Sequence, residues 1–301
     1  MDSNASISKL TAAMMPFTAI LWHDLSKLSR NWLVRLWLIA TALLAAFQLL
    51  GNWGQLQTAP LIAILLLPYL IFPWSLVVMM LSVTPMSGAQ AGVIADGILS
   101  RPVTRYSYLL AAWTARVTLV LSVFLLVTIP TIAIAALAER PPDADPVTLY
   151  GVAASLSVVA LVLTFLVSVG FLLGTLLRNT LLAVTVLVFL WFPVNLVLNM
   201  FSLEEMSPIS LTQALPTLLR QPWREVDEPE PAPELDTAFQ DAIKFFGSFG
   251  GSQPAAEPEN QGFFEQGDYE DFSLKRVLLG YGIPALVSVL LATVCFGFRD
   301  V

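Results

Sequence analysis

Long apolar stretches constrain this chain more than any other feature of its sequence. Six stretches are each close to, or longer than, the roughly twenty residues that cross a bilayer as a helix. They occupy residues 33–50, 60–83, 108–138, 149–177, 180–200 and 277–298. Only 12% of the residues are charged and 56% are hydrophobic, which leaves too little polar surface for an aqueous fold. We therefore predict an all-α integral membrane protein with six transmembrane helices.

The segment before the first stretch has a different pattern. Apolar residues recur at steps of three or four from Met14 to Trp32, while His23, Lys27 and Arg30 fall on the other side. An apolar face beside a basic face is typical of a helix that lies in the headgroup plane. Residues 1–32 are thus predicted to form a cytoplasmic N-terminus with an interfacial amphipathic helix.

Basic residues near the ends of the predicted spans set the orientation. With both termini in the cytoplasm, nine basic residues face inward and six face outward. The inner set is Lys9, Lys27, Arg30, Arg35, Arg101, Arg105, Arg116, Arg178 and Arg299, and the outer set is Arg140, Arg220, Arg224, Lys244, Lys275 and Arg276. The chain is accordingly divided into the N-terminal region, spans one to five over 33–200, an outer insert over 201–273, and a last span with a cytoplasmic C-terminus over 274–301.

The outer insert is strongly acidic. It contains fifteen Asp and Glu residues against three basic ones. Residues 207–223 are apolar enough to form one or two amphipathic helices against the outer ends of the spans. Residues 225–271 combine Pro, Gly and acidic residues, a composition that predicts partial disorder. Two interpretations stay open: a solvated spacer, or a surface for a cationic ligand or an extracytoplasmic partner.

The spans hold little that could perform chemistry. Apart from Arg35 at the start of the first span, Arg116 is their one charged side chain, and it lies near enough to the predicted interface to reach it. His23 and Cys295 are the only residues of their types, and neither an HExxH zinc motif nor a GxxxxGK[ST] phosphate loop occurs. We expect no catalytic residue, no metal and no cofactor in this chain. No pattern of basic residues in the sequence indicates nucleic-acid binding.

Packing signals remain. Gly170 and Gly174 form a small-xxx-small face that favours close helix packing or subunit association. Asn195 and Asn199 stand one turn apart near the outer end of the fifth span, where they either face a translocation path or bond between helices. Proline inside the spans is expected to kink them, at Pro68, Pro73, Pro130, Pro193 and Pro284.

A cytoplasmic loop over about 84–107 carries the most informative pattern. It contains DGILSRPVTRYSYLL, in which Asp96, Arg101 and Arg105 are the charged residues, and a turn GTLLRNT follows between spans four and five. With the N-terminal helix, the outer insert and the ending FGFRDV, the chain resembles the permeases of type 2 ABC transporters. The resemblance implies that this loop couples to a separate ATPase, with Asp96, Arg101 and Arg105 as contacts.

The resemblance also implies the rest of the assembly. A second permease copy or a similar subunit would complete the membrane part, and the partner ATPase would bind ATP and Mg. The protein would lie in the prokaryotic cell (inner) membrane. It would export its substrate by alternating access. Two alternatives stay open: a non-transporting scaffold or mechanotransmission subunit with an extracytoplasmic partner, and a membrane-embedded enzyme.

Overall fold

The fold is a bundle of helices. The structure, a computed structural model, describes residues 3–83, 105–141, 145–177, 179–200, 207–221 and 273–298. Within these ranges every regular element is a helix, which confirms the all-α prediction for this part of the chain. Most of the predicted coupling loop and of the acidic insert lies outside the described residues, so the prediction of disorder in the insert stays a prediction.

Among the described residues, five helical segments are long and apolar enough to cross a membrane. The helix α8, Thr180–Met200, occupies the predicted fifth span, but only its part up to Trp191 has described side chains. The count of six therefore stays a prediction. The five segments are α2 (Trp32–Gly51), α3 with α4 (Thr58–Leu70 and Trp74–Val83), α6 (Arg105–Leu137), α7 (Leu149–Leu176) and α11 (Leu274–Phe298).

The second span is interrupted. Its two helices, α3 and α4, end and begin on either side of Pro73, which has no N–H to donate to the preceding turn. The expected kink is thus a complete break at this position. The other four prolines lie inside continuous helices: Pro68 in α3, Pro130 in α6, Pro193 in α8 and Pro284 in α11.

The N-terminal helix differs from its prediction in two ways. It forms α1, Ser3–Ser29, and ends before Trp32, because Asn31 caps the next helix by accepting a hydrogen bond from the Leu33 N–H at 3.1 Å. Its apolar side also meets protein: α1 lies along α6, and Leu25 and Leu28 pack against the main hydrophobic cluster. Leu25 and Leu28 thus face protein, and the location of α1 in the headgroup plane stays a prediction.

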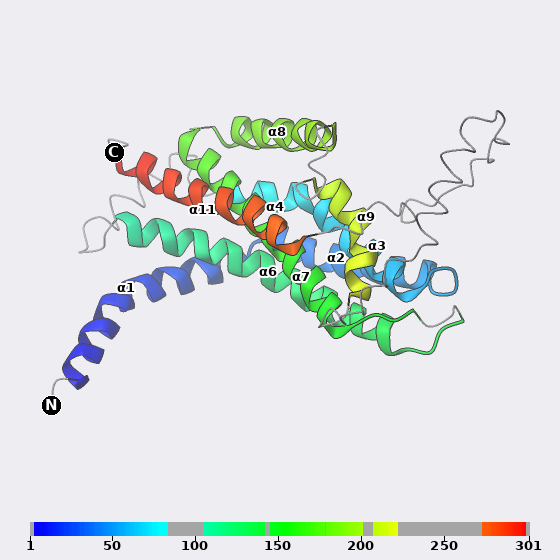
Figure 1. The fold of residues 1–301 in the computed structure, drawn as a ribbon. Helices are drawn as coiled ribbons and strands as arrows, with labels where there is room; N and C mark the ends of the chain where they lie inside the picture. The colour runs from blue at the N-terminus through cyan, green and yellow to red at the C-terminus, as the bar shows by residue number, and fades with distance from the viewer. Residues whose placement is uncertain are drawn as a thin grey trace, which may run out of the picture.

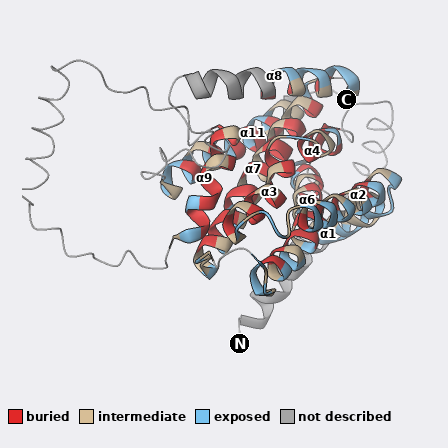
Figure 2. Ribbon diagram, turned by 90° about the vertical axis from the view of Figure 1, so that its right-hand side faces the viewer, coloured by how far each residue is buried: buried red, intermediate tan, exposed pale blue. Residues whose placement is uncertain are grey.

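The centre of the bundle is α7. It packs along α11 and α4 and also touches α6, so that its buried side chains lie in the middle of the molecule (Figures 1 and 2). Edge-to-face aromatic pairs join neighbouring helices, with centroids 4.8 Å apart for Tyr69 and Phe124 and 5.5 Å apart for Phe165 and Tyr281. These contacts tie α3 to α6 and α7 to α11.

A short helix closes one end of the bundle. Residues Pro208–Arg220 form α9, as expected for the first part of the insert, and α9 packs against α3 and α7 with most of its residues buried. Figure 1 shows α9 crossing these helices. We call this end, which also holds the α2–α3 and α6–α7 loops, the outer end, after the predicted orientation. The opposite end, where α6 begins and α11 ends, is the inner end (Figure 1).

Candidate functional site

The residues predicted to contact an ATPase fall mostly outside the described part of the chain. Asp96 and Arg101 lie in the undescribed segment 84–104. Arg105 is the first residue of α6, at the inner end, and its side chain is not described. The coupling assignment therefore stays a prediction, although the structure places the end of this loop at the start of a long helix.

The candidate path residues are placed by their backbone alone. Asn195 and Asn199 lie in the last two turns of α8, and α8 makes contact with α9 at the outer end. Their side chains are outside the described residues. Whether they face a path or a neighbouring helix stays a prediction.

The two packing glycines lie where α7 meets α4. A Cβ built on Gly170 would stand 1.8 Å from Ser82 Oγ, and one on Gly174 would stand 2.8 Å from the backbone oxygen of Val83. Any larger residue would force these helices apart. At these positions the glycines allow α7 to pack closely against α4 of the same chain.

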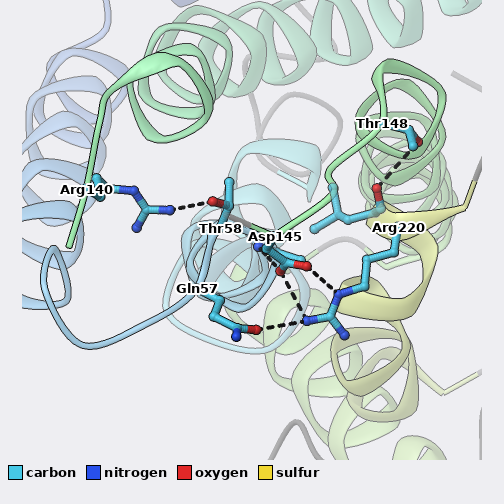
Figure 3. A network of polar contacts seen from close by, with 8 residues as sticks. Gln57, Thr58, Arg140, Asp145, Thr148 and Arg220 are labelled. Atoms are coloured by element: carbon cyan, nitrogen blue, oxygen red, sulfur yellow. Dashed lines mark hydrogen bonds and ion pairs between the residues drawn. The ribbon is translucent and has the colours of Figure 1, made fainter. Parts of the chain in front are cut away.

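An ion pair that the sequence analysis missed joins three segments at the outer end. Arg220, the last residue of α9, forms a bidentate ion pair with Asp145 of the α6–α7 loop. Its Nε donates to Oδ1 at 2.8 Å and its Nη2 to Oδ2 at 3.1 Å (Figure 3). The N–H of Ala59, in the first turn of α3, donates to the same Oδ2 at 3.0 Å. Arg220 Nη2 also reaches Gln57 Oε1 at 3.4 Å. We call Gln57, Ala59, Asp145 and Arg220 the outer clasp.

Burial makes the clasp unequal. The side chain of Asp145 is only 4% exposed, whereas that of Arg220 is 42% exposed. A carboxylate removed from water is costly unless its oxygens are hydrogen-bonded, and here both are. Asp145 is therefore the buried member of the clasp, and Arg220 bonds to it from the solvent side.

Two further contacts hold the same loop. Arg140 donates from Nη1 to the Leu56 carbonyl at 3.1 Å and from Nη2 to Thr58 Oγ1 at 2.6 Å (Figure 3). Thr148 caps α7 through its hydroxyl, which accepts from the Gly151 N–H at 2.9 Å, and its own N–H donates to the Leu219 carbonyl at 3.0 Å. The α6–α7 loop is thus bonded to the start of α3 on one side and to the end of α9 on the other.

Arg116 is the second polar feature that differs from expectation. It is 2% exposed, so it does not reach an interface as predicted. One of its terminal nitrogens bonds to the Ala112 carbonyl of the preceding turn, and its guanidinium lies 5.4 Å from the centroid of the Phe171 ring. Its Nε has no hydrogen-bond partner among the described residues. Asp24 of α1 is near enough for its charge to act on this guanidinium.

The geometry defines a multi-pass helical membrane protein whose described polar groups hold helices and loops together. Within the described ranges no group of three or more His, Cys, Asp and Glu side chains is arranged to hold a metal ion. Residues 97–246 match the model of the ABC-2 family transporter proteins. This match confirms the resemblance to type 2 ABC permeases. No curated protein matches the chain.

Proposed function

We propose that this protein is the permease subunit of an ABC exporter whose ATP is hydrolysed by a separate ATPase. The observation that carries the proposal is the position of the family match. It begins at Gly97, beside Asp96 in the predicted coupling loop, and continues through α6, α7, α8 and α9. The second part of the loop and the helices α6 to α9 thus lie within one family match, as expected when the loop drives these helices.

The assembled transporter would contain two permease copies, or this chain with a similar subunit, and two ATPase subunits. In each copy α8 supplies the sixth span, both termini are cytoplasmic, and α1 lies at the inner interface of a prokaryotic cell membrane. The arrangement of the helices supports an even number of spans, because α6 begins at the same end of the bundle at which α11 ends (Figure 1). ATP and Mg would be bound by the partner.

The long helix α6 offers a direct connection from the loop to the outer end. Its 33 residues span about 50 Å without interruption. It begins at Arg105 and ends at Leu137, a few residues before the loop that carries Arg140 and Asp145. Because helices are stiff, a shift of the coupling loop would move this outer loop as well, and the outer clasp would pass the movement to α9.

Alternating access would then consist of the inner and outer ends opening in turn. In this scheme α9 and the adjoining end of α8, with Asn195 and Asn199, border the outer mouth of the path. The class of exported substrate is left open. A scaffold that binds the ATPase but moves nothing would share the coupling loop, so the decisive measurement has two parts.

The first part tests coupling. Reversing both charges, Arg101→Glu with Arg105→Glu, should abolish copurification of the proposed partner ATPase, while membrane insertion stays normal. The matched control, Lys275→Glu with Arg276→Glu, reverses two basic residues at the first turn of α11 and should leave the complex intact. A complex that survives the first pair of changes contradicts the coupling assignment.

The second part tests transport. In the intact complex, a disulfide would be engineered between the α9 helices of the two permease copies. It should stop the conformational cycle and reduce ATP hydrolysis at least tenfold, with recovery on reduction. A scaffold with no outer gate would keep its hydrolysis rate in the oxidised form. That result would favour the non-transporting alternative.

A further inference from the structure

The charges of α1 are sorted by side. Three residues that carry or can carry positive charge, His23, Lys27 and Arg30, follow one another at steps of four and three, which places them on one stripe along the helix. All three are exposed. Asp24 lies on a different face and is partly buried. The helix therefore presents a basic side to its surroundings and keeps its acidic residue inward.

The inward position of Asp24 has a physical reason. Leu25 and Leu28 anchor α1 on the main core, and α1 lies along α6. There, Asp24 is near the buried guanidinium of Arg116, which lacks a full set of hydrogen-bond partners among the described residues. A buried positive charge is costly without a nearby negative one. Asp24 is thus the partly buried charge of α1, and the basic stripe lies on the exposed side.

Exposed aromatic residues flank the stripe. Trp22 of α1 is 74% exposed, and Trp32, at the start of α2, is 75% exposed. One turn further, Arg35 is also exposed. Large amphipathic rings beside basic residues are typical of the boundary between headgroups and hydrocarbon.

The next residues of α2 show where that boundary lies. From Leu36 onward, α2 exposes an apolar stripe at steps of three and four, which is the surface expected against lipid tails. The stripe consists of Leu36, Ile39, Leu43, Phe47 and Leu50. Figure 1 shows α2 following α1 along the bundle, and Figure 2 shows exposed residues on both helices. The basic residues thus stand directly at the inner end of a lipid-facing surface.

We propose that this face binds the headgroups of anionic phospholipids in the inner leaflet. It consists of His23, Lys27, Arg30 and Arg35 with Trp22 and Trp32, and we call it the basic–aromatic face. Lys27, Arg30 and Arg35 form no ion pair with any described residue, so their charge is available to a ligand. Continuity with the apolar stripe of α2 favours lipid over an acidic protein surface as the occupant.

The proposal is tested on the full-length protein in detergent, with phosphatidylglycerol as the anionic probe and phosphatidylcholine as the zwitterionic one. Native mass spectrometry would count the lipids bound. The unmodified protein should retain phosphatidylglycerol in preference. Lys27→Gln, Arg30→Gln and Arg35→Gln together should lower its apparent affinity by about fivefold for each charge removed. The control pair Lys275→Gln and Arg276→Gln should change it little.

Three outcomes would overturn the inference. Equal binding of the two lipids by the unmodified protein would remove its basis, and so would an equal loss in the triple variant and in the control. Release of the ATPase by the triple variant, with lipid binding unchanged, would identify the face as a protein-docking surface. Asp24→Asn provides a second route: it should loosen α1 and weaken phosphatidylglycerol binding without removing any basic residue.

Discussion

Gly151 shows how much of this bundle depends on the absence of one side chain. It lies in the first turn of α7, where α9 crosses. A Cβ at this position would stand 2.3 Å from the backbone oxygen of Leu219 and 2.5 Å from its carbonyl carbon. Backbone atoms cannot rotate away as the tip of a side chain can, so any larger residue must displace α9 as a whole.

We therefore expect Gly151→Ala to lower the free energy of unfolding by about 1–3 kcal/mol, the usual cost of overpacking. Gly282→Ala in α11 is the control, since nothing lies within 4 Å of the new methyl group. There the higher helix propensity of alanine should leave stability unchanged or raise it by up to about 1 kcal/mol. Reversible unfolding in mixed micelles measures both. Equal stability of the two variants would show that α9 does not pack as closely as described.

Single residues were predictable from sequence when their reason was local. Gly170 and Gly174 stand out because their spacing on one helix is visible without the fold. Gly151 gave no such signal, because the backbone it touches belongs to α9. Thr148, which lies close to Gly151 in the sequence, bonds to the same Leu219 across a separation of 71 residues. Asp145 gave no signal in the sequence either, although its side chain is the buried member of the clasp.

At the scale of elements, the outer clasp decides how firmly α9 is held. Asp145 accepts from Arg220 and from the Ala59 N–H, so one carboxylate connects α9, α3 and the α6–α7 loop. Asp145→Asn and Arg220→Gln should each destabilise the protein by roughly 1–3 kcal/mol, as is usual for hydrogen bonds to charged groups. The double variant should cost less than the sum, because each single change already breaks the same pair.

Arg35→Gln is the control for this cycle. Arg35 is exposed and forms no ion pair with a described residue, so its loss should change stability by less than about 0.5 kcal/mol. Additive effects of Asp145→Asn and Arg220→Gln, measured by the same unfolding assay, would mean that the two side chains act independently and that α9 is held by apolar packing alone.

Helix positions were well predicted from sequence, and helix interruptions were not. The spans predicted over 149–177 and 180–200 agree closely with α7 and α8, because uniform apolar composition and a polar turn mark their limits. The apolar pattern of the second span did not predict that α3 would end at Leu70, since the apolar run continues through Pro73. Nor did the pattern of the N-terminal segment predict that the apolar side of α1 would face α6, because a helical stripe has the same spacing whether protein or lipid covers it.

At the scale of the whole molecule, orientation is the prediction on which every functional assignment depends. If the inner end of the bundle faces the cytoplasm, the loop before α6 meets the ATPase, and the outer clasp, α9 and the acidic insert face the other side. The sequence basis is the distribution of nine basic residues inside and six outside, which is a modest bias. The fold adds that loops 52–57 and 138–148 lie at one end with α9.

Labelling of single cysteines in intact cells tests this orientation. Cys295 is first replaced by Ala, since it is the protein's only cysteine. A cysteine at Gly54, where nothing lies within 4 Å of a new side chain, and one at Gly251 should react with a membrane-impermeant maleimide. Cysteines at Ser100 and Arg178 should stay unmodified in intact cells and react once the membrane is opened, which shows that protection comes from the bilayer and not from burial.

The opposite pattern would place the loop before α6 outside the cell, where no ATP is supplied, and the permease assignment would lose its ATPase. Modification at Gly54 together with protection at Gly251 would instead retain the inner ATPase site and show an odd number of crossings between α2 and the insert, so that α8 would not be a span.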